Sequence, residues 1–426
     1  MSLLADLLST VFDRSRRAVP AGQWDNRAME ELVADLIGNR GEVRGMILAR
    51  QILDRYAAMT QEEKRGFFLH LATGLDINPD RVRSTLQDYE TASSKASYRA
   101  FMAASEPPRQ ELVRRLNQVP GATGSLVAMR NDLLAMTREE PTLAAVDLDF
   151  RHLFSSWFNR GFLVLRPINW ESPAHVLEKI IAYEAVHAID SWDDLRRRMQ
   201  PTDRRCFAFF HPAMPDEPLI FVEVALTKGV PGAISQVLTE DRDVLKAEEA
   251  DTAVFYSISN CQAGLAGISF GNSLIKQVVD DLSRELPGLK TFVTLSPIPG
   301  LTAWLEEEGV SEETARANLA PLTARYLLQA KRPGGAPRDP VARFHLGNGA
   351  MVHAVHAEAD PSTNGQKQSF GAMVNYLYDL SAVAQNHERF ADSHEVAAAP
   401  SVVALARAAE KAAEKAGDKT DTKGAK

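Results

Sequence analysis

A chain of 426 residues, of which 45% are hydrophobic and 24% charged, falls within the range of globular proteins and is too long for one ordinary domain. Its formal net charge of -8 argues against a general nucleic-acid-binding protein, and no apolar run is long enough to span a bilayer. The two cysteines, Cys206 and Cys261, lie beside strand-like sequence, so we expect them to be core residues in a reducing compartment.

The N-terminal sequence MSLLADLLSTVFDRSRR places a short apolar run before basic residues. This order is the reverse of a secretory signal, and no signal-cleavage site follows it. We therefore expect an amphipathic helix there and a cytoplasmic protein.

Helical patterns fill residues 27–156, where apolar residues recur every three to four positions. Thr60 and Glu63 have the spacing of a capping box at the start of one of these helices. About seven helices are predicted, and none carries a catalytic cluster. Residues 1–157 are therefore predicted to form an all-helical N-terminal domain that acts as a scaffold or oligomer interface, with an effector site as the alternative.

Strand-like sequence begins at GFLVLRPINW, so we place a domain boundary near Phe158. Helices are expected to begin near Pro173 and Ser191, followed by a hairpin-like pair of strands, RRCFAFFHP and PLIFVEVAL. Residues 158–396 are assigned to one catalytic domain. The Ala-, Lys- and Glu-rich tail, residues 397–426, is expected to be largely disordered, or at most a frayed helix.

The central stretch of the chain predicts a strand, a loop, a helix and a second strand. AVFYSIS predicts a buried strand, a glycine-bearing loop follows, and an amphipathic helix is expected over Asn272–Leu286. KTFVTLS predicts a strand that ends at Ser296, because Pro297 follows it. Free N–H groups and the positive dipole at such a helix start favour a pyrophosphate or another anion. The loop has neither the Walker nor the dinucleotide spacing, and an ordinary strand-to-helix turn is the alternative.

Two later segments carry polar side chains of interest. FHLGNGA is expected to form two short strands around an Asn348–Gly349 turn, with His345 just before the turn. SFGAMVNYLYDLSAVAQNHERFAD is expected to be a closing helical segment that directs Asn375, Tyr376 and Tyr378 toward a pocket.

Taken together, FYSISNCQAGLAGISFGNSLIKQVV, TLSPIPGLTAWL, FHLGNGA and MVNYLY resemble the malonyl-CoA decarboxylase family, and the order of elements resembles the coenzyme A site of the GNAT acetyltransferase superfamily. The resemblance extends from about Trp157 to Phe390. It implies an α+β protein in which an all-α helical N-terminal domain precedes a GNAT-like mixed α/β catalytic domain. It also implies malonyl-CoA as the substrate, no metal, and no cofactor beyond the coenzyme A of the substrate.

The resemblance also implies site residues and an assembly. The catalytic pair is Ser296 in LSPIPG and His345 in FHLGNGA. A homo-oligomer, either a dimer or a tetramer, and a role in fatty acid or malonate metabolism are expected. The residues expected to bind the coenzyme A substrate are Ala266, Gly267, Ile268, Ser269, Phe270, Gly271, Asn272, Asn375 and Tyr376.

Decarboxylation of a 3-carboxyl thioester needs no exchangeable cofactor in principle, because the thioester carbonyl accepts the electrons as an enolate. The enolate must be stabilised and then protonated. We expect Ser296 to position His345, and a histidine with a near-neutral pKa to donate the proton. A GNAT-type acyltransferase and a catalytically inactive coenzyme A-binding regulator are the alternatives.

The remaining histidines are weaker candidates. His211, at the end of a strand, is the first alternative proton donor, although a structural hydrogen-bonding role is favoured. His353 and His356 are three residues apart, which points them to opposite faces of a strand, and His70 has no neighbour at metal-ligand spacing. Compared with animal members, Ser269 stands where an acidic residue is expected, and the C-terminal KGAK is not a peroxisomal tripeptide.

Overall fold

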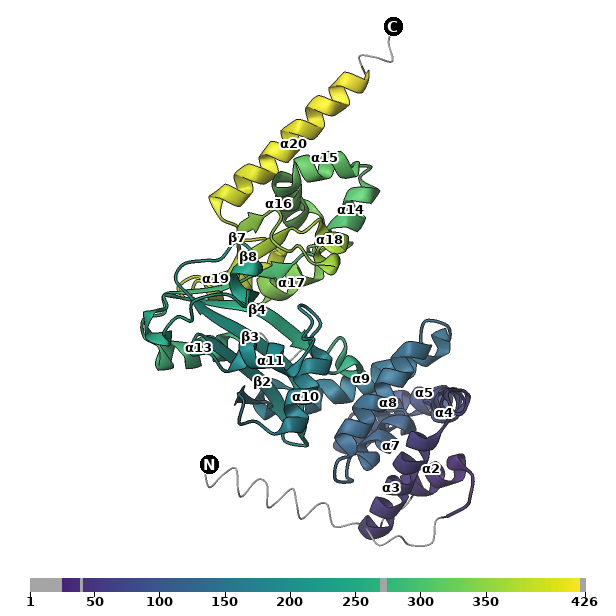
Figure 1. Cartoon of the computed structure of the whole chain (residues 1–426). Helices are drawn as coiled ribbons and strands as arrows, with labels where there is room; N and C mark the ends of the chain where they lie inside the picture. The colour runs from purple at the N-terminus through teal and green to yellow at the C-terminus, as the bar shows by residue number, and fades with distance from the viewer. Residues whose placement is uncertain (1–24, 39–40, 269–273, 422–426) are drawn as a thin grey trace. The chain divides into compact units, whose positions relative to one another are not determined.

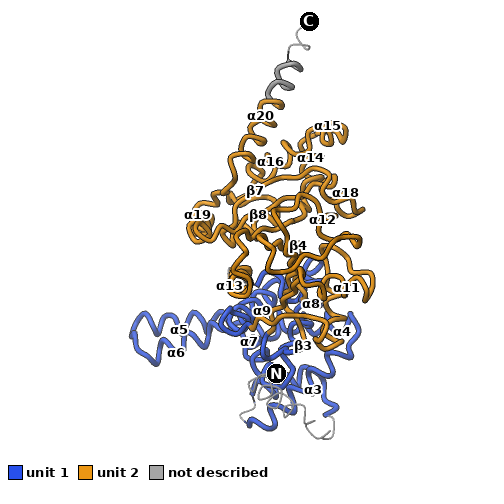
Figure 2. The backbone as a smooth tube through the Cα atoms, turned by 60° about the vertical axis from the view of Figure 1, so that its left-hand side comes forward, with its two compact units in different colours: residues 1–163, 211–215, 262–269 blue, residues 164–210, 216–261, 270–426 orange. Residues whose placement is uncertain are grey.

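The computed structural model describes residues 25–38, 41–268 and 274–421. These residues form two compact units, which Figure 2 shows in blue and orange. Unit 1 consists of Met1–Leu163, His211–Pro215 and Gln262–Ser269, and unit 2 consists of Val164–Phe210, Asp216–Cys261 and Phe270–Lys426. Residues 158–163 and two short internal segments of the predicted catalytic domain are thus part of the helical unit. The predicted N-terminal amphipathic helix lies outside the described residues.

Unit 1 is built from α-helices, as the apolar periodicity predicts. The capping box is present at the start of one of them, since the Thr60 side chain accepts from the Glu63 N–H and the Glu63 carboxylate accepts from the Thr60 N–H. The helices described in this unit, labelled in Figure 1, are α2 (Met29–Gly38), α3 (Glu42–Ala58), α4 (Gln61–Gly74), α5 (Pro79–Thr91), α6 (Lys95–Ser105), α7 (Pro108–Leu116), α8 (Ala122–Met136) and α9 (Ala144–Trp157).

Unit 2 is organised around a mixed eight-stranded sheet in the order β1-β2-β3-β4-β5-β8-β6, with β7 paired to β8. The pair β4–β5 is parallel, whereas β1–β2, β3–β4, β5–β8, β6–β8 and β7–β8 are antiparallel. The strands are β1 (Val164–Ile168), β2 (Arg204–His211), β3 (Met214–Thr227), β4 (Thr252–Asn260), β5 (Thr291–Thr294), β6 (Ser296–Pro297), β7 (Met351–His356) and β8 (Met373–Leu377).

The helices of unit 2 pack on this sheet through buried apolar residues. One cluster joins Leu177, Leu195 and Phe221, which lie on α10, α11 and β3. The helices are α10 (Ala174–Tyr183), α11 (Trp192–Met199), α12 (Ser235–Leu238), α13 (Leu274–Glu285), α14 (Leu301–Glu307), α15 (Glu312–Ala317), α16 (Leu319–Gln329), α17 (Pro340–Gly347), α18 (Thr363–Ser369), α19 (Val383–Ser393) and α20 (Pro400–Asp421).

The prediction of one closing helical segment near residue 375 is wrong in its first half. Met373–Leu377 forms β8, and only the later part is helical, as α19. The residues MVNYL include β-branched and aromatic side chains that suit a strand. Pairing with β5, β6 and β7, all distant in the chain, then decides the conformation.

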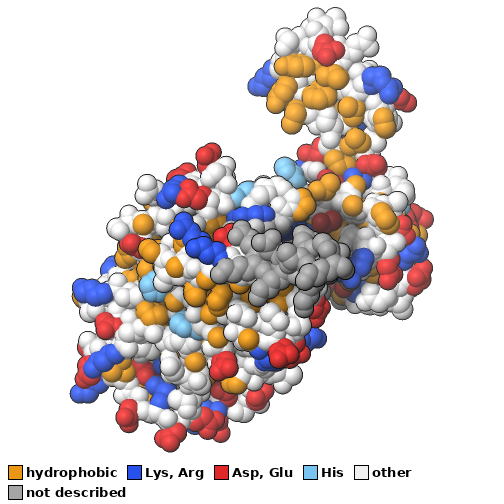
Figure 3. Space-filling model, turned by 90° about the horizontal axis from the view of Figure 1, so that it is seen from above, with side chains coloured by type: hydrophobic (Ala, Val, Ile, Leu, Met, Phe, Trp, Pro, Cys, Tyr) orange, Lys and Arg blue, Asp and Glu red, His pale blue; other side chains and the backbone are white. Residues whose placement is uncertain are grey.

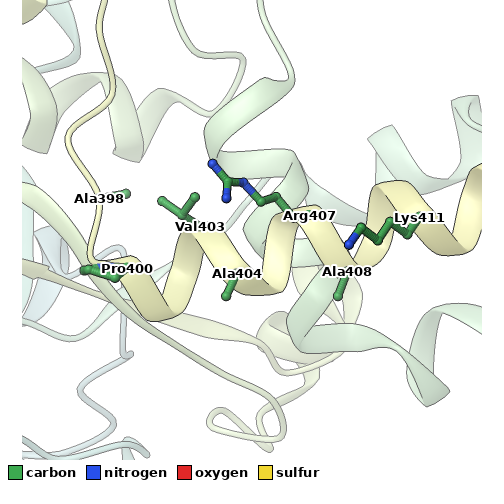
Figure 4. Close-up of a pocket in the computed structure, with 7 residues that line it drawn as sticks. All are labelled: Ala398, Pro400, Val403, Ala404, Arg407, Ala408 and Lys411. Carbon is green, nitrogen blue, oxygen red and sulfur yellow. The ribbon is translucent and has the colours of Figure 1, made fainter.

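The prediction of a largely disordered C-terminal tail is also wrong, because α20 runs from Pro400 to Asp421. Val402, Ala406 and Ala409 are buried, and α20 packs against α16. Their helical spacing gives the helix an apolar stripe to bury. A hollow of about 590 Å³ lies along α20 (Figure 4) and is lined by Ala398, Pro400, Val403, Ala404, Arg407, Ala408 and Lys411.

Among the described residues, no helix is both long enough and apolar enough to cross a bilayer. On the face shown in Figure 3, acidic and basic side chains are interspersed, with hydrophobic side chains scattered between them.

A buried carboxyl group lies within the sheet of unit 2. Glu223 on β3 is fully buried, and its Oε2 atom lies 3.4 Å from the Arg198 guanidinium. Its Oε1 atom has no hydrogen-bond partner within the described ranges. Burial, with a further contribution from the charge of Glu184, raises the pKa of Glu223 to about 8. The carboxyl group is therefore protonated in the folded protein at neutral pH.

Replacing this group should change how stability depends on pH. Glu223 makes its full contribution to stability below pH 4.5, its pKa in the unfolded state. This contribution is lost as the pH rises toward about 8, its pKa in the folded state. Glu223→Gln cannot titrate, so the free energy of unfolding, measured by urea denaturation, should fall less between pH 5 and pH 8 than in the wild type. Glu178→Gln, an exposed change on α10, should keep the wild-type slope. Equal slopes for Glu223→Gln and wild type would contradict this account.

Candidate active site

Ser296 and His345, predicted as the catalytic pair, lie together in unit 2. The Ser296 Oγ atom is 3.2 Å from the His345 Nε2 atom, which is hydrogen-bond distance. Ser296 is 5% exposed and His345 is 3% exposed, so the pair is almost completely shielded from water. Neither residue lines the hollow along α20.

Ser296 is held by the strand that follows β5. The chain breaks from β5 at Leu295 and continues as β6, where Ser296 pairs with Val374 of β8. The predicted strand over KTFVTLS is therefore divided, and Ser296 begins its second piece. The Ser296 hydroxyl donates to Thr294 Oγ1 at 2.8 Å. We did not identify Thr294 from the sequence, although its position two residues before Ser296 is the spacing of one strand face.

His345 lies in α17, and the prediction of two short strands around an Asn-Gly turn is wrong. Asp339 caps this helix by accepting from the Ala342 N–H at 2.8 Å, and Pro340 occupies the first turn. At the other end, Gly349 has a positive φ of 85° and donates to Leu346 O, while Ala350 N donates to His345 O. These two bonds form a Schellman motif, so Asn348–Gly349 ends a helix here instead of joining two strands.

Two tyrosines, Tyr376 on β8 and Tyr378 just after its end, surround the imidazole of His345. The Tyr378 hydroxyl is 2.8 Å from His345 Nδ1, and the Tyr376 ring stacks on the imidazole with centroids 4.6 Å apart. Burial lowers the pKa of His345 to about 3, so the imidazole is neutral at neutral pH. The expected near-neutral pKa is therefore wrong, because the sequence does not show how deeply the ring is buried.

Hydrogen-bond directions fix a single arrangement of protons in this cluster. Because the Ser296 hydroxyl donates to Thr294, its oxygen accepts the Nε2–H of His345. Nδ1 of the neutral ring is then the acceptor for the Tyr378 O–H. A chain of donors thus runs from Tyr378 through His345 to Ser296.

The sheet opens beside this cluster. The parallel register of β4 with β5 runs from Thr252 with Thr291 to Phe255 with Thr294, and the next residue, Leu295, donates its N–H to Phe255 O. Ser296 then pairs with β8. The strands β4 and β5 therefore diverge at the level of Ser296.

The described part of the glycine-bearing loop before α13, residues 262–268, belongs to unit 1. Ala266 and Gly267 are exposed, Gly267 has a positive φ of 74°, and Ile268 is buried. Four of the predicted coenzyme A-binding residues lie outside the described residues: Ser269, Phe270, Gly271 and Asn272. The loop's anion-binding role therefore stays a prediction.

Asn375 and Tyr376, predicted to face a pocket, are both fully buried. Asn375 donates from Nδ2 to Thr294 O at 2.7 Å, and its Oδ1 atom bonds to His356 Nε2. Tyr376 contacts the His345 imidazole through its ring. Their predicted contact with the substrate stays a prediction.

The structure gives His211 the structural role that we favoured. Its Nε2 atom lies 3.1 Å from Trp157 O and its Nδ1 atom accepts from the Ala213 N–H at 3.1 Å, so backbone groups engage both ring nitrogens. Its ring also contacts Phe158 with centroids 4.9 Å apart. This histidine anchors the His211–Pro215 segment to the helices of unit 1.

The helical unit, the mixed sheet and the buried serine–histidine pair define an α+β protein whose candidate active site lies in the unit that contains the sheet. Two family models match the chain: the malonyl-CoA decarboxylase C-terminal domain over residues 161–317 and 307–416, and the N-terminal domain over residues 75–158. The chain belongs to the malonyl-CoA decarboxylase family, and it is a carboxy-lyase. The predicted family, fold class and reaction are thereby confirmed.

Individual relatives agree with this assignment. The mitochondrial malonyl-CoA decarboxylase of Anser anser anser is 35% identical over 352 residues, covering 70% of this chain and 69% of that protein. The Mus musculus enzyme is 31% identical over 416 residues, covering 82% and 83%. Crystal structures of malonyl-CoA decarboxylase from Rhodopseudomonas palustris and Agrobacterium vitis are 47% and 50% identical, each with a TM-score of 0.84. They cover 88% of this chain and 98% and 99% of their own chains.

The two tyrosines beside His345 provide a matched test of the proton arrangement. Tyr378→Phe removes the donor to the buried Nδ1 atom, so we expect a loss of roughly 1–3 kcal/mol in the free energy of unfolding. Tyr376→Phe removes a buried hydroxyl that has no partner in the described part of the chain, and should cost little or nothing. Urea denaturation measures both. A larger loss in Tyr376→Phe than in Tyr378→Phe would show that the hydrogen-bond assignment is wrong.

Proposed function

We propose that Ser296 and His345 together protonate the enolate formed when malonyl-CoA loses carbon dioxide. The single observation that supports this most strongly is the buried hydrogen bond of 3.2 Å between Ser296 Oγ and His345 Nε2. In the reaction, the bond between the carboxylate carbon and the α-carbon breaks, and its electron pair moves into the thioester as an enolate. One proton must then reach the α-carbon to give acetyl-CoA.

The proton comes from a neutral chain of donors. Ser296 turns its hydroxyl proton away from Thr294 Oγ1 and gives it to the α-carbon. The Ser296 oxygen takes the Nε2–H of His345, whose Nδ1 atom takes the proton of Tyr378. No imidazolium is needed, since a thioester enolate is a far stronger base than a phenolate. The phenolate left at Tyr378 is reprotonated from solvent, so one proton is consumed for each carbon dioxide released.

The proposed substrate contacts follow from the divergence of β4 and β5. The thioester carbonyl lies at this opening, where backbone N–H groups stabilise the enolate oxygen, and one such donor typically lowers the barrier by ~2.7–4 kcal/mol. The diphosphate of coenzyme A binds the glycine-bearing loop through backbone N–H groups. We also propose a cytoplasmic enzyme that acts in fatty acid or malonate metabolism.

Incubating the enzyme with malonyl-CoA alone tests this proposal. Acetyl-CoA and carbon dioxide should appear in equal amounts without an acceptor amine. A requirement for an acceptor would instead favour the acyltransferase, and binding without turnover would favour the inactive regulator.

Substitutions in the pair should separate chemistry from binding. His345→Asn and Ser296→Ala should each lower kcat by roughly 10² or more and leave the Kd for coenzyme A nearly unchanged, because each removes a group used in proton transfer. The double variant should be far less impaired than the product of the two single losses, because both residues serve one step.

His211→Asn is the matched control for this test. Its ring is tied to backbone groups of unit 1, so the change should affect stability without lowering kcat comparably. Near-normal kcat in His345→Asn, or strictly multiplicative losses in the double variant, would show that the proton comes from another group.

We further propose that the enzyme self-associates through the hairpin of α5 and α6. No residue of α5 is buried, and Ala104 is the only buried residue of α6. Leu86, Tyr98 and Met102 are exposed, at 37%, 51% and 50%. In Figure 2 the two helices extend as a pair from the rest of unit 1. Since isolated helices of this length are marginally stable, a second copy of the chain covering their apolar side chains would stabilise them.

A charge on this hairpin should weaken the assembly. Tyr98→Glu combined with Met102→Glu should shift the protein toward monomer at micromolar concentration, because burying two carboxylates in an interface is unfavourable. Light scattering measures the mass, and Ile47→Glu, at an exposed position on α3, is the control. A monomeric wild type, or an unchanged assembly in the hairpin variant, would contradict the proposal.

A further inference from the structure

We propose that the helical unit 1 builds the phosphate-recognition site for coenzyme A. In this proposal Arg130 on α8 is a positioning residue that holds the glycine-bearing loop, defined here as residues 262–268, and Arg151 on α9 binds the phosphate directly. The inference rests on the proposed function, because it takes this loop as the site of the substrate's diphosphate. It assigns a binding role to a unit for which only a scaffold, an interface or an effector site was expected.

Arg130 is hydrogen-bonded to the backbone of the loop. The side chain is 1% exposed, and its Nη1 atom donates to Gly264 O at 2.8 Å and to Ala266 O at 2.9 Å. Its Nε atom donates to Asp147 Oδ1 at 2.8 Å, which compensates the buried charge. A buried guanidinium that spans two carbonyl groups of one loop fixes the direction of both peptide dipoles.

Each carbonyl oxygen of the loop from Gln262 to Ala266 accepts a hydrogen bond. Those of Gln262, Ala263 and Leu265 accept from the N–H groups of residues 265, 266 and 268, and Arg130 takes the remaining two. Among the described residues, the N–H of Gly267 has no acceptor. This arrangement suits an anion, because carbonyl oxygens that would repel a phosphate are turned away while an N–H group remains to be satisfied.

The loop is also packed directly against the backbone of α8. A Cβ atom at Gly264 would lie 1.9 Å from Val127 O, a distance that no side chain could tolerate. Val127 and Arg130 are on the same helix, three residues apart. The helix therefore holds the loop both by contact and by hydrogen bonds, which makes the loop a rigid part of unit 1.

Arg151 supplies a cation at the exposed side of the same loop. Its guanidinium atoms lie 3.6–3.9 Å from the position of a Cβ atom at Gly267, and Arg151 is exposed. Within the described ranges its side chain makes no ion pair. An exposed guanidinium beside a glycine whose N–H has no acceptor among the described residues is well suited to bind a phosphate oxygen.

The test compares malonyl-CoA with S-malonyl pantetheine, which carries the same thioester but no phosphate. Arg151→Gln should lower kcat/KM for malonyl-CoA by about tenfold or more, mainly through KM, because a hydrogen bond to a charged group is lost. Arg130→Lys should have the same effect, since lysine keeps the charge but not the rigid fork that reaches two carbonyl groups. Neither change should alter kcat/KM for S-malonyl pantetheine by more than about twofold.

Two arginines of unit 1 serve as matched controls. Arg109 is also buried and paired with an acidic residue, Asp149, but bonds to carbonyl groups of α4, so Arg109→Lys should leave the ratio of the two substrates unchanged. Arg81 on α5 is exposed, and Arg81→Gln controls for the loss of one surface charge.

The outcomes separate this inference from the proposed function. Equal losses on both substrates, or no loss on malonyl-CoA in Arg151→Gln and Arg130→Lys, would overturn the inference while decarboxylation by the wild type stands. Failure of the wild type to decarboxylate malonyl-CoA would overturn the proposed function itself. A loss confined to malonyl-CoA in both variants, absent from both controls, would establish the role of unit 1.

Discussion

The hydrogen bond between Ser296 and His345 depends on a single short strand, β8. The two residues are 49 positions apart in the chain, on β6 and α17. A third element is therefore needed to hold them together. Strand β8 pairs with β6 at Val374, stacks Tyr376 on the imidazole and bonds to it through the neighbouring Tyr378. Any shift of β8 along its neighbours would therefore disturb the serine, the imidazole and the imidazole's hydrogen bond together.

Burial of this cluster determines which chemistry it can perform. In a water-excluded site the charged form of histidine is disfavoured, so a mechanism through a preformed imidazolium would begin from a rare state. A chain of neutral donors avoids this difficulty, and its hydrogen bonds are stronger in a medium of low dielectric. In the proposed reaction, the same burial keeps water away from an enolate that must accept its proton at carbon. The burial that excludes water from the site thus also keeps His345 neutral.

Local signals in the sequence predicted much of the fold. The capping box at Thr60, the N-cap at Ser191 and the apolar stripe of α13 all depend on residues within one or two turns, and the structure confirms each of them. The Asn348–Gly349 dipeptide led to a wrong prediction of two strands, because the same dipeptide suits a hairpin turn and a helix C-terminus. Asp339 and Pro340, which begin α17, are the sequence signal that distinguishes a helix from a hairpin here. Strand β8 could not be predicted in this way, since its partners lie far away in the chain.

The glycine-bearing loop shows why a motif alone could not define the site. Gly264 and Gly267 look equivalent in the sequence, but different constraints require them. At Gly264 the constraint is packing, because the backbone of α8 occupies the space of a side chain. At Gly267 it is the positive φ, and the side chain of Arg151 lies beside this exposed glycine. Only the second glycine points to a ligand, and the arginine that supports the loop is 134 residues away from Gly264, beyond the reach of any local pattern.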